Sequence, residues 1–141
     1  MLARRELSVA QVRERLGRKG FDAAAVQDAI SRLAANGTLD DLRVARAVAR
    51  TRATVKRQGR SRVVRELANI GISRDVAQQV IAEVFGDLDE PALLDEALSR
   101  RLRGSISLSD PAARRRVFAA LIRQGFSPEA ITRAMKQRAK V

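Results

Sequence analysis

One pattern recurs three times along this chain and constrains its fold more than any other feature. It is a helix, a glycine and a second helix, with apolar residues at matching positions. The three copies are Val12, Leu16, Gly20, Phe21, Val26 and Ile30; Val63, Leu67, Gly71, Ile72, Ala77 and Ile81; and Val117, Leu121, Gly125, Phe126, Ile131 and Met135. Such a recurrence predicts structural repeats that stack on one another.

The residues around each glycine predict a tight turn between two helices. A residue with positive φ ends a helix most easily when it has no Cβ atom, as glycine does. The apolar residue that follows is placed to pack back on the helix just ended. Next comes Asp22, Ser73 or Ser127, whose side-chain oxygen is suited to accept a hydrogen bond from the first amides of the following helix.

The three glycines lie 51 and 54 positions apart, which leaves room for one more helix ahead of each pair. Asp40 or Asp41 predicts the start of one such helix, and Asp89 with Pro91 predicts the start of another. We interpret Leu2–Leu7 as a shortened first helix. We therefore expect an all-α protein of tandem three-helix repeats in an elongated, curved array. The predicted repeats cover residues 1–37, 38–86 and 87–141.

The composition excludes several classes of function. The chain has neither Cys nor His, so disulfides, thiolate chemistry, the commonest general base and the commonest metal ligand are absent. Asp40 and Asp41 are better interpreted as helix caps than as a metal site. No apolar run approaches the roughly 20 residues of a membrane span, and no signal peptide is evident. We expect a cytoplasmic, monomeric protein without catalytic activity, cofactor or metal.

The formal charge of +12 is concentrated in the middle of the chain. Residues 38–86 contain ten basic and five acidic residues, a net charge of +5, the largest of the three repeats. The stretch from Leu42 to Arg65 has no acidic residue and nine basic ones: Arg43, Arg46, Arg50, Arg52, Lys56, Arg57, Arg60, Arg62 and Arg65. We predict that this basic block binds a partner, either an acidic protein surface or DNA phosphate.

Four residues of the basic block have spacings of three, four and seven, which predict one stripe along a continuous helix: Arg43, Arg46, Arg50 and Arg57. A second basic region contains Arg114–Arg116 and, in the tail, Arg133, Lys136, Arg138 and Lys140. For this second region, a solvated helix face and a partner contact are equally good interpretations.

Three strings of this sequence resemble the RecX family of RecA modulators, which are built from tandem three-helix repeats. They are Leu2-Ala3-Arg4-Arg5-Glu6-Leu7-Ser8 through Arg18-Lys19-Gly20-Phe21; Gly37-Thr38-Leu39-Asp40-Asp41 through Arg43, Ala45 and Arg46; and Gly59-Arg60 through Val63, Glu66, Leu67 and Gly71-Ile72. The third repeat matches through its turn from Leu121 to Phe126. Where the family usually has aromatic residues, this chain has Thr38, Val44 and Val48.

The resemblance implies a function in DNA recombination, DNA repair and the SOS response. It implies that the protein lies along the groove of the RecA nucleoprotein filament and limits ATP hydrolysis, strand exchange and coprotease activity. An array of repeats suits that task, because linked contacts with several subunits of a polymer raise the effective concentration. Binding to free DNA is expected to be weak and independent of sequence.

Two alternative functions stay open. A helix, a glycine turn and a second helix also describe a helix-turn-helix DNA-binding protein. In the second copy, however, the helix that would contact the bases carries Gln78, Gln79 and Glu83, and only one basic residue, Arg74. This composition is poorly suited to approach phosphate. A purely structural adaptor is the other alternative.

Overall fold

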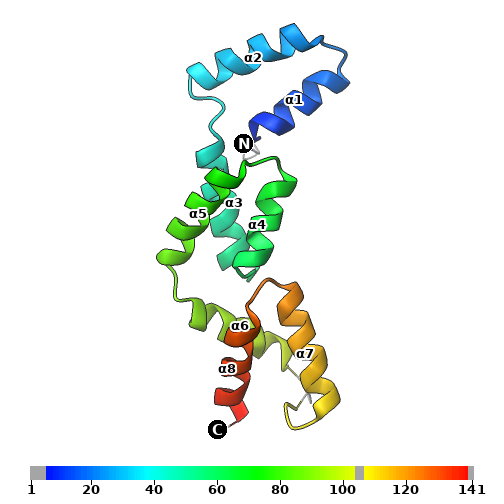
Figure 1. The fold of residues 1–141 in the computed structure, drawn as a ribbon, viewed down its shortest axis with the longest axis vertical. Helices are drawn as coiled ribbons and strands as arrows, with labels where there is room; N and C mark the ends of the chain where they lie inside the picture. Colours follow the sequence, from blue (N-terminus) through cyan, green and yellow to red (C-terminus); the bar gives the residue numbers. More distant parts are fainter. Residues whose placement is uncertain (1–5, 104–106, 140–141) are drawn as a thin grey trace.

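The computed structural model describes residues 6–103 and 107–139. These residues form eight α-helices and no strand: α1 (Val9–Arg18), α2 (Ala23–Ala35), α3 (Asp41–Thr54), α4 (Arg60–Asn69), α5 (Arg74–Gly86), α6 (Glu90–Arg101), α7 (Pro111–Arg123) and α8 (Pro128–Ala139). The helices form an elongated array, with α1 and α2 at one end, α3, α4 and α5 in the middle and α6, α7 and α8 at the other end (Figure 1). The predicted all-α fold of tandem helical repeats is confirmed.

Each repeat has its own apolar core. In the middle repeat, the core contains Val63, Leu67 and Val80, all fully buried, and extends to Phe85. The third repeat has a separate core around Leu98, and the first has a small one. The extensive contacts between helices are likewise confined to α1 with α2, to the set α3, α4 and α5, and to the set α6, α7 and α8. Apolar packing therefore stabilises each repeat individually.

The glycine turns form as the sequence predicts. Gly20, Gly71 and Gly125 have φ angles of 94°, 84° and 106°. In each turn the amide of the next residue donates to a carbonyl of the last helical turn, at N–O distances of 3.0 to 3.3 Å. The polar residue that follows accepts a hydrogen bond from the next helix, as Asp22 does from the Ala25 amide at 2.8 Å. These bonds pair groups that helix ends otherwise leave free.

One detail of the turns differs from the prediction. Ile72 is buried and Phe126 packs against the third core, but the Phe21 side chain is 54% exposed. The expectation that Phe21 packs back on its helix is therefore wrong. Among the described residues, only α1 and α2 build the first repeat, and neither of them buries this ring.

The predicted starts of the additional helices are confirmed. Asp40 accepts a hydrogen bond from the Arg43 amide at 3.2 Å, and Asp89 accepts one from the Ala92 amide at 3.0 Å. In the Leu2–Leu7 segment, which we interpreted as a shortened helix, residues 2–5 lie outside the described residues, as does residue 140 of the basic tail. The segment from residue 6 to the N-cap of α1 is not helical.

The third repeat joins the second where the end of α7 meets the start of α4. Gly59 lacks a capping side chain, and its amide donates instead to the Gln124 carbonyl at 2.9 Å. The Ser61 amide donates to the Gly125 carbonyl at 3.3 Å. A Cβ atom on Gly59 would lie 2.7 Å from the amide nitrogen of Phe126, so this approach requires glycine. The free amides of α4 are thus paired with the free carbonyls of α7.

The second repeat joins the first in the same way, where the end of α4 meets the start of α1. The Ser8 hydroxyl donates to the Ile70 carbonyl at the end of α4. The Asp41 carboxylate accepts a hydrogen bond from the Val9 amide at 2.8 Å, so it caps α1 rather than its own helix. As a result α7, α4 and α1 succeed one another end to end along the array (Figure 1).

We expect small-angle X-ray scattering to show the extended shape in solution. A compact globule of this length would have a radius of gyration of about 14 Å. The array should give a clearly larger value and an asymmetric pair-distance distribution. A radius near that of the globule would contradict the arrangement in Figure 1.

The contact between Gly59 and Gly125 predicts opposite effects for two Gly→Ala substitutions. Gly59→Ala should lower the free energy of unfolding by roughly 1–3 kcal/mol, because its methyl group meets backbone that cannot rotate away. Gly17→Ala, inside α1 with no atom near the added Cβ, should raise it by about 0.5–1 kcal/mol. Denaturation followed by circular dichroism compares the two variants, and equal effects would contradict the close joint.

Candidate functional site

The basic block is divided between two helices and the loop that joins them. Helix α3 carries its first four members and α4 its last three, while Lys56 and Arg57 lie in the loop. Because α3 ends at Thr54, the predicted stripe from Arg43 to Arg57 on one helix is wrong at its last member. Arg57 has a φ angle of 55°, in the left-handed region that side chains disfavour.

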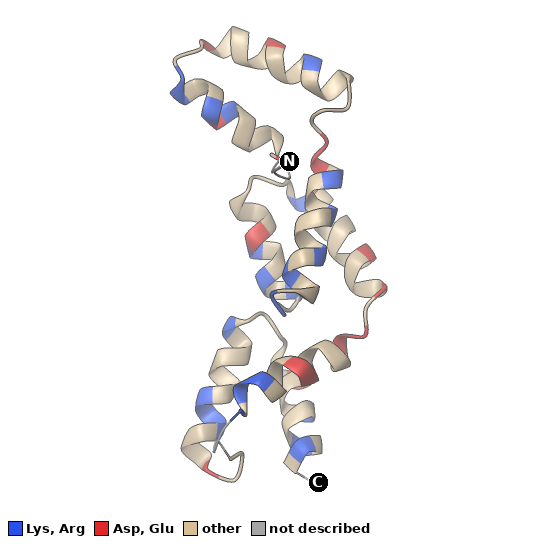
Figure 2. Ribbon diagram, turned by 180° about the vertical axis from the view of Figure 1, so that it is seen from behind, with Lys and Arg blue, Asp and Glu red and all other residues tan. Residues whose placement is uncertain are grey.

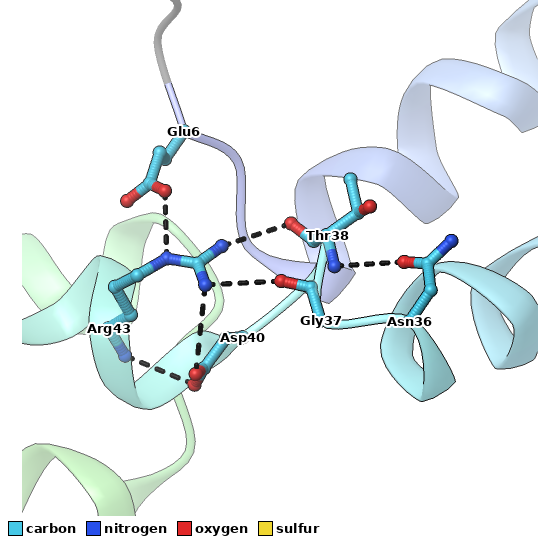
Figure 3. A network of polar contacts seen from close by, with 6 residues as sticks. All are labelled: Glu6, Asn36, Gly37, Thr38, Asp40 and Arg43. Atoms are coloured by element: carbon cyan, nitrogen blue, oxygen red, sulfur yellow. Dashed lines mark hydrogen bonds and ion pairs between the residues drawn. The ribbon is translucent and has the colours of Figure 1, made fainter.

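Arg43 connects the first repeat to the second (Figure 3). Its Nε donates to the Glu6 carboxylate at 2.8 Å. Its Nη1 and Nη2 donate to the carbonyls of Gly37 and Thr38 at 3.1 and 3.2 Å. All three acceptors lie on the connections that flank α1 and α2. The acidic motif that carries the family resemblance therefore forms a joint between two repeats.

Arg46 pairs with Glu83 across the middle repeat, from α3 to α5. The distance from Nε to Oε2 is 2.8 Å, and Nη2 lies 3.3 Å from Oε1, so the contact is bidentate. Hydrogen bonds from Arg46, and then from Gln79, hold the pKa of Glu83 below its ordinary value. The same bond raises the pKa of Arg46. Glu83 is thus kept ionised on the outer face of α5.

Three further arginines bind the third repeat. Arg57 Nε donates to Glu96 at 2.8 Å, and Arg60 Nε donates to Glu90 at 2.9 Å. The Arg60 guanidinium also lies 5.4 Å from the centre of the Phe85 ring, a cation–π contact. Arg62 Nη1 donates to the Arg123 carbonyl at the end of α7, at 3.2 Å.

The same joint holds Arg57 in its unfavourable backbone conformation. The side-chain amide of Gln124 donates to the Arg57 carbonyl at 2.6 Å, from the turn that follows α7. A left-handed residue with a side chain costs roughly 1–2 kcal/mol. The hydrogen bond from Gln124 and the ion pair with Glu96 therefore fix the loop from both sides.

Glu66 neutralises two more members of the basic block. Its carboxylate lies 3.0 Å from Arg62 Nε and 3.7 Å from Arg52 Nη2, and its side chain is only 17% exposed. The sequence has Glu66 directly after Arg65, outside the stretch without acidic residues. Six of the nine basic residues thus have an acidic partner: Arg43, Arg46, Arg52, Arg57, Arg60 and Arg62.

Three members of the block form no ion pair within residues 6–103 and 107–139. Arg50, Lys56 and Arg65 are exposed, and we call them the open cations. Arg65 makes only a long contact of 3.5 Å with the Arg123 carbonyl. Figure 2 shows Lys and Arg gathered at the end of the second repeat that faces the third. Among the described residues, the open cations are the members of the block whose charge no internal acid neutralises.

The sequence reasoning missed the acidic partners of the arginines. Glu6, Glu83 and Glu96 lie 37, 37 and 39 positions from the arginines that they bind. No local pattern connects residues so far apart. Of the three positions without family aromatics, two are part of the apolar packing, since Val44 is 2% exposed and Val48 packs against the second core, whereas Thr38 is exposed.

Two other observations concern the described residues as a whole. No helix among them is long and apolar enough to cross a membrane. Within the same ranges, no group of three or more Asp or Glu residues is arranged to hold a metal ion.

In the second basic region, Arg138 donates to the Ser99 hydroxyl at 2.8 Å and also pairs with Asp95.

Family models of RecX match all three repeats. The model described as "RecX, first three-helix domain" matches residues 1–33, the second three-helix domain matches residues 40–81, and the third matches residues 89–135. The matches occur in chain order.

Individual RecX proteins are similar over almost the full length. The "Regulatory protein RecX" of Xanthomonas campestris pv. campestris (strain B100) is 35% identical over 136 residues, 96% of this chain and 82% of that protein. The protein of the same name from Syntrophotalea carbinolica is 32% identical over 128 residues, 90% of this chain and 84% of that protein. The crystal structure of RecX from Lactobacillus salivarius has the same fold, with a TM-score of 0.77, 17% identity and coverage of 96% and 87%.

The pair of Arg46 and Glu83 predicts a specific pH dependence. Because the pKa of Glu83 is lowered in the folded protein, the pair stabilises the fold above the ordinary Glu pKa of 4.5. This contribution is lost as the pH falls through the lowered value. Nuclear magnetic resonance of the Glu83 carboxyl carbon should give a midpoint below 4.5, and Arg46→Gln should raise it.

Arg50→Gln is the matched control for this titration. Arg50 lowers the pKa of Glu83 only through its distant charge, the smallest of the contributions, so its replacement should move the midpoint less. Equal midpoints in the parent protein and in Arg46→Gln would show that the pair does not persist in solution.

Proposed function

This chain belongs to the RecX family of regulatory proteins, and from that premise we propose that it binds the RecA nucleoprotein filament. We propose that it modulates, mainly by inhibition, the filament's ATPase, strand-exchange and coprotease activities in DNA recombination and repair. The observation that carries this proposal is the match of RecX models to all three repeats. The protein would act without a catalytic step, as a monomer in the cytoplasm.

The shape of the molecule supports binding to a filament. An elongated array exposes much more surface along one direction than a globule of the same length, and a polymer repeats its own surface along its axis. We propose residues 1–37, 38–86 and 87–141 as the units that contact successive parts of the filament. Several weak contacts joined in one molecule give high overall affinity.

We propose that the basic block contacts the filament mainly through the open cations, Arg50, Lys56 and Arg65. Their charges are free to pair with acidic side chains of RecA or with DNA phosphates. The six arginines with internal acidic partners hold α3 and α4 in place and add to the positive field.

Sequence-specific DNA binding by a helix-turn-helix is less well supported. The turn from α4 to α5 has the right local form, but the exposed face of α5 carries Asp75, Gln78 and Glu83. Arg46 and Glu83 neutralise one another on this face, so Arg46 is not available to attract phosphate. The face therefore lacks the free positive charges that a reading helix needs.

Charge reversal at the open cations tests the proposed contact. The triple variant R50E/K56E/R65E should weaken inhibition of the RecA ATPase on single-stranded DNA by roughly tenfold or more, since three attractive contacts become repulsive. Its helical content should be unchanged, because these side chains are exposed and form no ion pair in the described part of the chain. Titration of the variant into an ATPase assay measures the effect.

A triple variant with the same change in charge serves as the control. Arg15, Lys19 and Arg116 are exposed and lie outside the basic block, so R15E/K19E/R116E should lose clearly less inhibition than R50E/K56E/R65E. Equal losses in both variants would assign the effect to total charge. If the parent protein leaves the RecA ATPase unchanged at stoichiometric dose, the proposed function itself is wrong.

A further inference from the structure

The third repeat has an open groove between α7 and α8, which contains none of the open cations. It has a volume of about 660 Å³, and its lining is mostly apolar. Its lining includes three apolar residues that are partly or fully buried, Leu108, Phe118 and Met135, which we call the floor. It also includes three exposed cations, Arg114, Arg115 and Lys136, which we call the rim. The groove lies on a different repeat from the open cations, so the two surfaces are separate.

The floor of this groove is suited to adapt to apolar side chains. Leu108 and Phe118 are only partly buried, and both pack from outside against the core of the third repeat. Met135 is 6% exposed and contributes a flexible, polarisable thioether. A cavity of this volume lies within the range that binds a few apolar side chains or a small ligand.

The rim is positive on both sides. Arg114 and Arg115 come from α7 and Lys136 from α8, and none of the described residues that line the groove is acidic. Within residues 6–103 and 107–139, the Arg114 guanidinium donates only to the Leu108 carbonyl, at 3.4 Å. Among the described residues, neither Arg115 nor Lys136 forms an ion pair. The groove therefore combines an apolar floor with unneutralised positive charge.

We propose that this groove binds an amphipathic helical segment of a partner protein, with apolar residues on one face and Asp or Glu beside them. The apolar face would lie on Phe118 and Met135, as in other helix-in-groove contacts. The acidic residues would pair with Arg115 on one side and Lys136 on the other. A nucleic acid is a poorer match, because phosphates cannot fill an apolar floor and the Phe118 ring is partly buried.

Synthetic helical peptides of about 14 residues, four turns, are the probes. The test peptide has Leu along one face and Glu on the neighbouring positions. One control peptide replaces every Glu with Lys, and the other replaces every Leu with Ser. Only the first peptide should bind the full chain, and it should shift the amide resonances of Phe118, Thr132 and Met135.

Two variants separate the rim from the floor. R115E/K136E should weaken binding of the test peptide by roughly tenfold, through lost attraction and added repulsion. Thr132 lines the groove and is exposed, so Thr132→Trp should block the floor and weaken binding without a change in charge. R15E/K19E, with the same charge change on the first repeat, should bind as the parent protein does.

Several outcomes would overturn this proposal. If the Ser peptide binds as strongly as the test peptide, charge alone explains the binding. If Thr132→Trp binds the test peptide as the parent protein does, the floor of the groove is not the binding site. Resonance shifts confined to α3 and α4 would show that the peptide binds the basic block instead of the groove. Displacement of the peptide by phosphatidylglycerol vesicles or by an oligonucleotide would assign the groove to a lipid or nucleic-acid partner. None of these results depends on RecA, so the proposed function is tested separately.

Discussion

The shared helix ends determine how the repeats of this protein are assembled. Every helix ends with backbone groups that lack a partner within the helix. Here the free carbonyls at the end of α7 accept from the amides at the start of α4, and the end of α4 accepts from Ser8 at the start of α1. The helix dipoles therefore run head to tail, which is the favourable order. These joints consist of hydrogen bonds and close contacts at glycine. The repeats are therefore connected while their apolar cores stay separate.

The basic block contains two kinds of cation, paired and unpaired within the described residues, that its composition alone does not distinguish. Exposed ion pairs contribute little to stability individually, because water screens them and the side chains lose freedom. At the joints, however, the arginines also bind carbonyls of the neighbouring repeat, as Arg43 and Arg62 do, and this fixes orientation. Most of the block is therefore engaged inside the molecule. Within the described part of the chain, the members of the block without an acidic partner are three, Arg50, Lys56 and Arg65, and they do not form one stripe on a single helix.

The sequence predicts features that local chemistry determines and misses those that depend on distant parts of the chain. The turns at Gly20, Gly71 and Gly125 follow from backbone sterics, and Asp40 caps its helix for an equally local reason. By contrast, the left-handed Arg57 is held from a turn far along the chain, at Gln124. The sequence also gives no sign that Asp41 caps a helix of another repeat. Local patterns thus predict the repeats, whereas the joints and the open cations require the three-dimensional structure.

The separate cores also affect how this chain reaches its folded state. Apolar contacts form between helices of one repeat, so they close short loops, and proteins dominated by such local contacts fold quickly. During synthesis each repeat is able to become structured soon after it emerges from the ribosome, before the next has been translated. The joints form last, because each needs residues from two repeats. Because each core is completed by residues of one stretch of the chain, few core residues wait for a distant segment, and this limits aggregation of the nascent protein.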